Sequence, residues 1–544
     1  MDEDGVDHTY DYGINKTKRP TVLEAERLLG VRVPSLRHSE TQLVDYMGGD
    51  AAIINAATNF YGLDAVGGMN PKDFMLALRT SGITAPFTFA EVKVNAKVSI
   101  DAAKKIVPFK RASVNEYSGR YSVMSDQFEN SAEGELGDRI TAAQREAYGA
   151  YDGLVSDKAE PRVDFTRELA RSILPFANQT QFYWKLNLED VFAFLKQNPN
   201  PHLTLKPFVE QLRVYAQAIA PLAYHAFQAV DENGERFQRD IAIDDRKRRG
   251  MNRKLDAPYG ISETRRLTVP KAEEDMFVVE PVLGDGFVAL TDYMGTDESI
   301  VQAARVSYGR GTKKVSEDRG LIRYLARHLH TTPSEMIEAA FVAKLPGFIL
   351  RQLIRHRTLD ETGFLGRIVP EEEAYVPPRS EMRSQSTANK QGRGNELEDD
   401  LKVRVDQTLR TQYDNQRALR AEAEAAGVHP DITRQIPGVG YFVGWSFKGD
   451  VKNFNHLLGL RLDSHAQKES QVYGQAVAKR LKRLAPTAYE AFEDYHQHAK
   501  RFSRLEMIAV SKMLSGSSKE EAIAASGLKG RELEELQAKL NIKA

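Results

Sequence analysis

The stretch Asp45-Tyr46-Met47-Gly48 recurs 247 residues later as Asp292-Tyr293-Met294-Gly295, and this repeat decides the fold. Two shorter pairs keep the same spacing: Ala56-Ala57 with Ala303-Ala304, and Tyr61-Gly62 with Tyr308-Gly309. Self-similarity at one fixed spacing indicates that a structural unit has been duplicated. The sequence therefore predicts two related domains of roughly 230 residues, each large enough to bury a hydrophobic core of its own.

The composition is that of an ordinary globular protein. Lys and Arg total 75 and Asp and Glu total 76, which gives a formal net charge of −1 at pH 7. This balance gives no electrostatic reason to expect a nucleic-acid partner. The start, Met1-Asp2-Glu3-Asp4, lacks the basic and apolar regions of a signal peptide. No apolar run approaches the ~20 residues of a membrane span, so we expect a cytoplasmic protein that does not cross a membrane.

Cysteine is absent from all 544 residues. This absence excludes a disulfide framework, a thiolate metal site and a thiolate nucleophile. No other residue cluster indicates a metal site. Any covalent or redox chemistry must therefore come from other side chains or from a bound cofactor.

The repeat divides the chain into five segments. We expect an N-terminal arm over 1–20, a first copy over 21–230, a charged linker over 231–267, a second copy over 268–500 and a helical tail over 501–544. The linker contains Arg246-Lys247-Arg248-Arg249, which could contact phosphate, although a solvated segment is the simpler interpretation. The tail has capping-box patterns in 517–521. Its short helices could form a helix-turn-helix, although packing or subunit contact is the simpler interpretation.

A cationic cluster distinguishes the second copy from the first. Arg355-His356-Arg357 follows the largely apolar 347–354 stretch, whereas the first copy has Pro108-Phe109-Lys110 at the matching positions. Arginine binds diphosphate oxygens or an anionic ring bidentately and keeps its charge. Cations also favour the C-terminal end of a helix for electrostatic reasons alone. The cluster therefore indicates either an anion site or a charged helix end.

A polar cluster distinguishes the first copy from the second. The stretch reads Asn115-Glu116-Tyr117-Ser118-Gly119-Arg120. Glycine lets the backbone approach a ligand, and the arginine and serine suit a nucleotide phosphate. A surface turn with an ion-paired arginine explains the stretch as well. The second copy keeps Gly366-Arg367 but has Leu365 in place of the serine.

Residues 355–358 of the second copy read RHRT, and residues 112–122 of the first copy read ASVNEYSGRYS. Joined at the matching position, they give RHRTASVNEYSGRYS. This composite resembles the signature of flavin-dependent thymidylate synthase, the ThyX family. Three further segments resemble family motifs: 460–467 (LRLDSHAQ), 171–175 (RSILP) and the aromatic 182–184 (FYW), which we expect in the core. The resemblance covers about 21–227 and 268–492. It implies an α+β fold with two tandem ThyX-like domains, each an antiparallel sheet flanked by helices.

The resemblance implies the reductive methylation of dUMP to dTMP. Methylenetetrahydrofolate would supply the one-carbon unit, NADPH would reduce FAD, and reduced FAD would supply hydride. The lack of cysteine fits, because the alternative route to thymidylate begins with a cysteine that attacks the uracil ring. Ser118 would bind dUMP and would not act as a nucleophile, because the motif offers no adjacent base.

Residue roles follow from the same resemblance. Arg461 would be catalytic, stabilising negative charge on the activated pyrimidine. The residues expected to bind dUMP are Arg351, Gln352, Arg355, Glu116, Tyr117, Ser118, Gly119, Arg120 and Arg171. Those expected to bind FAD are Ser307, His330, Thr332, Arg355, His356, Arg357, Asn115, Glu116, Asp450, Lys452 and His456. At 450 and 452 the family usually has asparagine and arginine, so this chain departs from the pattern there.

Each copy has lost a different set of the residues that the family motifs would require. The second copy keeps the flavin-side residues and Arg461, where the first copy has Asn198, and the first copy keeps the 116–120 loop and Arg171. We expect a homodimer that acts as a pseudo-tetramer with two complete sites. Two alternatives stay open: a flavin-dependent enzyme that leaves a hydroxymethyl group on dUMP, and a non-catalytic nucleotide-binding scaffold.

Overall fold

The computed structural model describes residues 13–59, 62–109, 111–119, 122–130, 132–155, 167–237, 241, 255, 258–306, 318–363, 370–387 and 392–540. It divides into two compact units, Met1–Tyr489 and Glu490–Ala544. The first unit contains the first copy and the second copy as far as Tyr489, and the second contains residues 490–500 together with the tail. The basic run 246–249, the Tyr61 and Tyr308 repeat positions, Arg120 and Ser307 lie outside the described residues.

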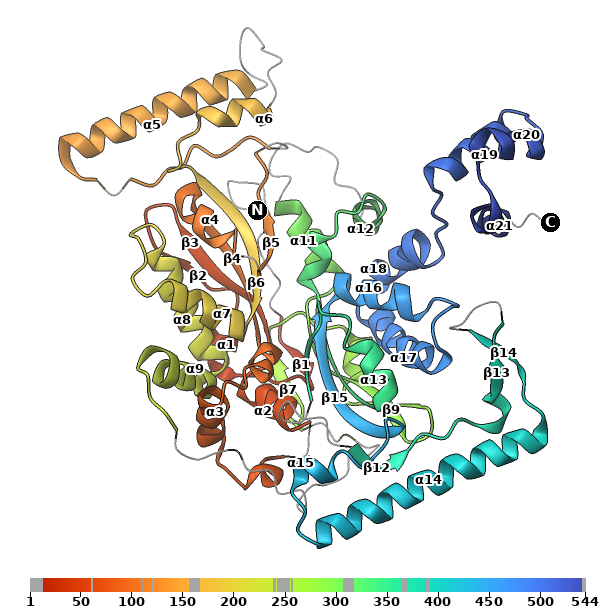
Figure 1. Ribbon diagram of the computed structural model, residues 1–544. Helices are drawn as coiled ribbons and strands as arrows, with labels where there is room; N and C mark the ends of the chain where they lie inside the picture. The colour runs from red at the N-terminus through yellow and green to blue at the C-terminus, as the bar shows by residue number, and fades with distance from the viewer. Residues whose placement is uncertain are drawn as a thin grey trace. The chain divides into compact units, whose positions relative to one another are not determined.

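The first copy is an α+β domain around an antiparallel sheet with strand order β2-β3-β4-β6-β5 (Figure 1). Its strands are β2 (Arg32–Pro34), β3 (Glu40–Met47), β4 (Glu91–Ser99), β5 (Ser113–Glu116) and β6 (Gln179–Asn187). Its α-helices are α1 (Leu23–Leu28), α2 (Asp50–Thr58), α3 (Pro71–Thr80), α4 (Ile100–Ile106), α5 (Gly134–Val155), α6 (Arg167–Ala170), α7 (Leu188–Gln197), α8 (Lys206–Ile219) and α9 (Pro221–Phe227). Shorter helical turns are η1 (Leu63–Val66), η2 (Ala85–Phe89), η3 (Arg171–Ile173) and η4 (Gln228–Glu232).

The second copy repeats this architecture, with strand order β8-β9-β10-β15-β11 and β12 also paired with β15. Its strands are β8 (Glu280–Val282), β9 (Gly286–Met294), β10 (Glu338–Pro346), β11 (Asp360–Thr362), β12 (Pro370–Ala374) and β15 (Tyr441–Asp450). Its helices are α10 (Pro270–Asp275), α11 (Asp297–Val306), α12 (Asp318–Arg327), η7 (Thr332–Met336), α13 (Gly347–Leu353), η9 (Arg379–Glu381), α14 (Asp399–Ala425), α15 (Pro430–Thr433), α16 (Val451–Arg461), α17 (Lys468–Leu484), α18 (Pro486–Phe492) and η10 (Glu493–Gln497). A further strand pair, β13 (Arg383–Gln385) with β14 (Arg393–Glu396), is antiparallel.

Both faces of the central strands are buried, for two different reasons. On β4, Val92 and Val94 belong to the hydrophobic core that α7 and α8 complete. Glu91 and Lys93 alternate with them and are also buried, at 3% and 1% exposure. A strand with one face in water would expose these charges. They are buried here because the second copy covers that face of the sheet.

The covered faces meet in a four-member ring of charges between the copies. Lys185 of β6 forms ion pairs with Glu91 and with Glu338 of the second copy, and Lys448 of β15 pairs with the same two carboxylates. Burial alone lowers the pKa of Lys448, but Glu338, Glu91 and Asp360 raise it well above its usual value. Each charge has two opposite neighbours in the ring, which offset part of the hydration lost on burial. The pKa of Glu91 is still raised, by burial and then by Glu338, against the lowering effects of Lys185 and Lys448.

The ends of the expected arm and linker are ordered, which corrects the expectation of a loose arm and a solvated linker over these residues. β1 (Asn15–Thr17) and β7 (Ser262–Thr264) pair antiparallel with each other. Arg19 then crosses to the second copy and donates to the Tyr293 carbonyl at 3.1 Å, and Arg266 crosses to the first and donates to the Tyr46 carbonyl at 3.2 Å. Both arginines are buried, so these segments are part of the junction between the copies.

The tail forms three helices, α19 (Arg504–Leu514), α20 (Lys519–Ser526) and α21 (Gly530–Lys539). They enclose a small core of Ala509, Leu528 and Leu536. Of the two expected capping boxes, the structure forms the one between Ser518 and Glu521, at the start of α20. Gly527 ends that helix with φ of 75°, a conformation that glycine adopts without strain.

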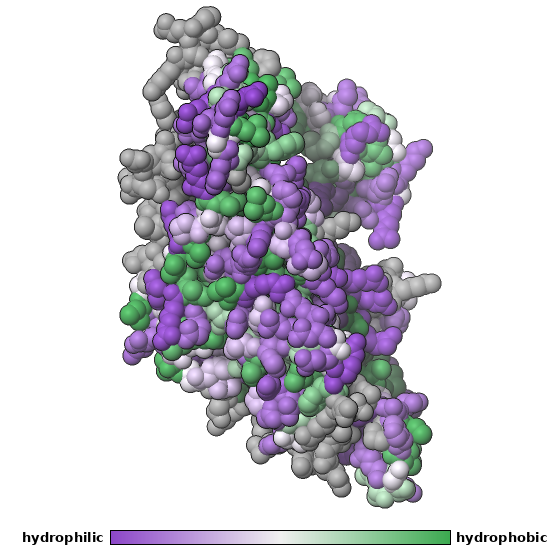
Figure 2. Space-filling view, turned by 90° about the vertical axis from the view of Figure 1, so that its left-hand side faces the viewer, coloured by the Kyte–Doolittle hydropathy of each residue, from purple (hydrophilic) through white to green (hydrophobic). Residues whose placement is uncertain are grey.

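On the face shown in Figure 2, hydrophilic and hydrophobic side chains are interspersed. Among the helices that the structure describes, none is both long and apolar enough to cross a membrane.

Candidate active site

Arg461 lies at the centre of a polar cluster in the second copy. It ends α16, and its Nε donates to Nε2 of His356 at 3.1 Å while its Nη2 donates to the Gln352 carbonyl at 3.1 Å. The Gln352 side chain donates to Gln467 at 2.6 Å. Gly474 of α17 lets this cluster form, because a Cβ at that position would lie 3.2 Å from the Arg461 Cβ. Hydrogen bonds therefore connect the region of Gln352 and His356 with the LRLDSHAQ segment, which contains Arg461 and Gln467.

His356 serves as a hydrogen-bond acceptor for Arg461. Burial, followed by the nearby charges of Arg461 and His456, lowers the pKa of His356 to about 4. The ring is therefore neutral near pH 7, with Nε2 unprotonated and able to accept from a guanidinium. Because His356 is only 7% exposed, its direct partner is Arg461, and the expected contact with FAD stays a prediction.

The neighbouring cations face solvent. Arg351, Arg355, Arg357 and His456 are all exposed, and the His456 ring centroid lies 5.8 Å from that of His356. Exposed cations next to a half-buried polar cluster can contact an anionic ligand without losing an internal partner. This arrangement is suited to a diphosphate or a reduced flavin ring.

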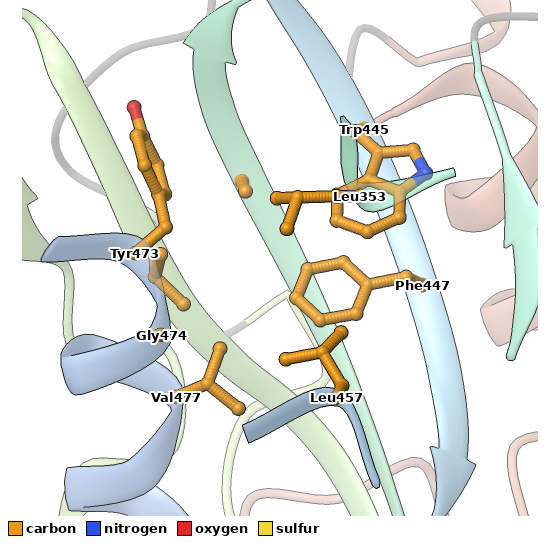
Figure 3. Close-up of a pocket in the computed structure, with 9 residues that line it drawn as sticks. Leu353, Trp445, Phe447, Leu457, Tyr473, Gly474 and Val477 are labelled. Atoms are coloured by element: carbon orange, nitrogen blue, oxygen red, sulfur yellow. The ribbon is translucent and has the colours of Figure 1, made fainter. Parts of the chain in front are cut away.

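Apolar side chains pack between the sheet and the helices that carry Gln352 and Arg461, and they form an apolar wall. Leu353, Leu457, Trp445, Phe447 and Val477 surround a cavity of only about 10 Å³ (Figure 3). That space is too small for a nucleotide or a flavin. The wall therefore holds α13, α16 and α17 in place against the sheet and does not itself form a ligand pocket.

The first copy holds the second group of expected residues. Thr180 donates to the Glu116 carboxylate at 3.0 Å, and a Cβ on Gly119 would lie 3.5 Å from the Arg171 side chain. Burial raises the pKa of Glu116, against the lowering effects of the Thr180 hydrogen bond and of Arg171. Arg171 is exposed and begins η3, where its Nε donates to the Glu168 carbonyl. Ser118 lies between Glu116 and Gly119 in the same loop.

The two copies meet where β5 contacts η7. The Asn115 side chain donates to the Thr332 carbonyl at 3.2 Å, which joins an expected flavin residue of the first copy to one of the second. The Tyr117 ring packs on a cluster that includes Tyr183 of the first copy and Met336 of the second. Thr332 and the nearby His330 are exposed. Residues from both copies therefore form one continuous surface at this junction.

Asp450 and Lys452 already have protein partners. Both Asp450 oxygens accept from Asn453, one from its backbone and one from its side chain, each at 2.8 Å. Asp450 thereby caps α16, and burial raises its pKa to about 7 against the lowering effect of Lys185. Lys452 forms an ion pair with Glu335. Their expected contact with FAD stays a prediction, and the structure shows instead that they fix the helix that carries Arg461.

The sequence motifs did not single out Thr180 or the charge ring. Glu91 and Glu338 are 247 residues apart, so the repeat spacing could have identified them as equivalent positions. Single charged residues within apolar strands carry no motif of their own, so only the repeat spacing marks them.

The fold and the site define a class of protein: two related α+β domains fused in one chain, with complementary polar clusters. A family model described as thymidylate synthase complementing protein matches residues 42–223 and 289–487, which is more than half of the chain. The chain belongs to this family. The two matched segments correspond to the two copies.

Named relatives agree with this assignment. A flavin-dependent thymidylate synthase of Ehrlichia ruminantium (strain Gardel) is 40% identical over 274 residues, covering 50% of this chain and 92% of the relative. One from Ruegeria pomeroyi is 40% identical over 279 residues, again 50% of this chain and 92% of the relative. Among solved structures, a UMP/dUMP methylase PolB from Streptomyces cacaoi bound with 5-Br UMP matches with 23% identity and a TM-score of 0.35, covering 40% of this chain and 98% of that one.

Proposed function

We propose that this chain is a flavin-dependent enzyme that methylates dUMP to dTMP, with methylenetetrahydrofolate as one-carbon donor and NADPH as reductant. The observation that carries the proposal is the sorting of the polar clusters. The second copy holds Gln352, His356 and Arg461 in one hydrogen-bonded group, and the first holds Glu116 and Arg171 in another. Family membership supplies the reaction class to which these clusters are suited.

The exposed cations at the end of α13 fit a flavin dinucleotide. Arg355, Arg357 and His456 face solvent beside a neutral, buried His356, so two permanent positive charges are available for diphosphate oxygens. Bound flavin would supply hydride in this reaction. Asn115 and Thr332 border the same region from the two copies and would limit the orientation of the ligand.

Arg461 would stabilise the activated pyrimidine. Its Nε and Nη2 are fixed by His356 and Gln352, whereas Nη1 has no hydrogen-bond partner among the residues that the structure describes. A guanidinium held by two of its three nitrogens can direct the third at an oxygen that gains negative charge, with little reorganisation during the reaction. Burial lowers the Arg461 pKa, but an arginine so far above neutral pH keeps its charge.

The first copy would hold the dUMP phosphate. Arg171 presents an exposed guanidinium beside the loop of Ser118 and Gly119, where a Cβ at residue 119 would lie 3.1 Å from Met124 and in ordinary contact with Arg171. Glu116 is half-buried and accepts from Thr180, so it shapes the loop and can accept a hydrogen bond from the sugar or base. The loop and Arg461 lie on different copies, and we propose that a homodimer joins complementary copies into two complete sites.

Product mass and flavin stoichiometry test the proposal together. Incubation of the purified full-length chain with dUMP, methylenetetrahydrofolate, FAD and NADPH should yield dTMP, with one FAD per chain in a dimer. A product heavier than dTMP by one oxygen would identify a hydroxymethyl transfer instead. No flavin binding and no turnover would contradict the enzyme and favour a nucleotide-binding scaffold. Two FAD per chain would contradict the sorting of sites between the copies.

A further inference from the structure

Two equivalent aspartates are buried where the copies meet. Asp45 accepts from the backbone N–H of Tyr46 at 2.9 Å and from that of Gly295 in the other copy at 3.2 Å. Asp292 accepts from Tyr293 at 2.8 Å and from Gly48 at 2.9 Å. Each carboxylate therefore has the same pair of peptide donors, one from its own copy and one from the other.

Only one of the two aspartates has a lysine beside it. The Lys93 ammonium lies 3.6 Å from Oδ2 of Asp45 and donates to the Met336 carbonyl at 3.1 Å. At the repeat spacing of 247 residues, the position equivalent to Lys93 is Ala340. The buried carboxylate of Asp292 therefore lacks the cation that its counterpart has.

A cavity occupies the equivalent position beside Asp292. Its lining includes Asp292, Ala340 and Phe89, and Phe89 is the counterpart of Met336, the second partner of Lys93. The cavity has a volume of about 20 Å³, which is enough for one water-sized molecule or ion. On the Lys93 side, Tyr183 packs with Met336 in a hydrophobic cluster, whereas the register places the small Ser446 at the equivalent position here.

The remaining polar groups of the cavity carry hydroxyl and amide oxygens with lone pairs. Thr291 donates its hydroxyl to the Ala340 carbonyl at 3.2 Å, and Ser446 donates to the Asn59 side chain at 2.7 Å. The Asn55 side chain donates its N–H to Tyr259 at 2.6 Å. Lone pairs on these oxygens and on Asp292 suit a hard cation, because such ions prefer carboxylate, hydroxyl and carbonyl ligands.

Nearby arginines do not remove the difference in charge between the surroundings of Asp45 and those of Asp292. Arg19 and Arg266 cross the junction in equivalent positions, and Arg19 interacts electrostatically with both aspartates. Burial raises the pKa of Asp292 to about 6, against the lowering effects of Arg266 and Arg19. The arginines therefore leave part of the cost of burying this carboxylate uncompensated.

We propose that the cavity beside Asp292 binds one small monovalent cation, K⁺ or NH₄⁺, in the place that the Lys93 ammonium takes beside Asp45. Such an ion has about the size of the space and one positive charge, which matches the charge difference between the two sides. The bound ion would stabilise the junction of the two copies. The site lies on the covered faces of the sheets and is separate from the candidate active site.

Thermal unfolding of the full-length chain at pH 8, where Asp292 is ionised, tests the proposal. KCl or NH₄Cl would replace choline chloride at constant ionic strength, and the midpoint would be followed by circular dichroism. We expect the smaller cations to raise Tm by about 2–6 °C, because a ligand that binds only the folded state stabilises it. An equal Tm in all three salts would overturn the proposal, as would a response to MgCl₂ alone.

Variants assign the response to this cavity. A340K places an ammonium where Lys93 has one, so it should raise Tm in choline chloride and abolish the response to K⁺ and NH₄⁺. D292N is nearly isosteric and should also abolish the response, which covers the case in which A340K does not fold. K93A opens the equivalent space beside Asp45 and should enlarge the response. If D292N keeps the full response, the ion binds elsewhere and the inference is wrong.

Discussion

The neutral state of His356 predicts how the stability of this protein depends on pH. Burial, Arg461 and His456 lower the pKa of His356 to about 4, and an unfolded histidine has a pKa of about 6.5. Between these values the unfolded chain binds one more proton than the folded chain, so stability falls as pH falls. From these two pKa values, the linkage relation gives a loss of about 2 kcal/mol between pH 7.5 and pH 5.

Replacing His356 by glutamine isolates this effect. Glutamine does not titrate, and its side-chain oxygen can still accept from Arg461, so H356Q should lack the loss assigned to His356. Urea unfolding of both proteins at pH 7.5 and pH 5 gives the two differences in free energy of unfolding. Other titrating groups cancel in the comparison, and H225Q, which removes an exposed histidine of α9, should behave like the unmodified chain. Equal pH dependence of H356Q and the unmodified chain would show that His356 is not held neutral by its surroundings.

Three further predictions concern the site and the junction. R461A should reduce the turnover number about 10²–10³-fold while FAD stays bound, because the lost group would act on developing charge; unchanged turnover would exclude the proposed role. R171A should raise KM for dUMP by more than tenfold with a smaller effect on FAD affinity measured by absorbance titration, and an unchanged KM would place the phosphate elsewhere. K448M should lower the free energy of unfolding, measured in urea, by about 3–5 kcal/mol, because it leaves buried carboxylates unpaired. K97M on the neighbouring sheet is the control. An equal loss in both variants would contradict a special role for the four-member ring of charges.

Copy-specific losses are consistent with fusion of the two copies in one chain. A self-associating single domain would need every residue of the junction and of the site on each subunit. In this chain, Lys93 and Ala340 or Tyr183 and Ser446 occupy equivalent positions and differ completely. Covalent linkage fixes which copy meets which, so each copy can lose what the other supplies. The same asymmetry produces the complementary polar clusters and the cavity beside Asp292.

The sequence by itself determined the number of domains and the identity of most candidate site residues. The 247-residue spacing predicted two copies, and the family resemblance predicted α+β domains with antiparallel sheets, which the structure and the family match confirm. Arg461 and His356 belong to two separate motifs, and Gln352 directly precedes the motif that contains His356. The sequence predicts which residues of one motif lie together, because neighbouring residues share one helix or one turn.

Only the tertiary structure decided what those residues contact. Arg19 seemed part of a loose arm, yet it is buried because it reaches Tyr293, 274 positions away. Glu91 and Lys185 lie in strands that look amphipathic, yet both faces are covered by partners from two different parts of the chain. Asp450 caps a helix, and His356 accepts from Arg461. The physical reason is that burial and pairing depend on which surfaces meet in space, and the alternation of residues along a strand does not specify what covers its second face.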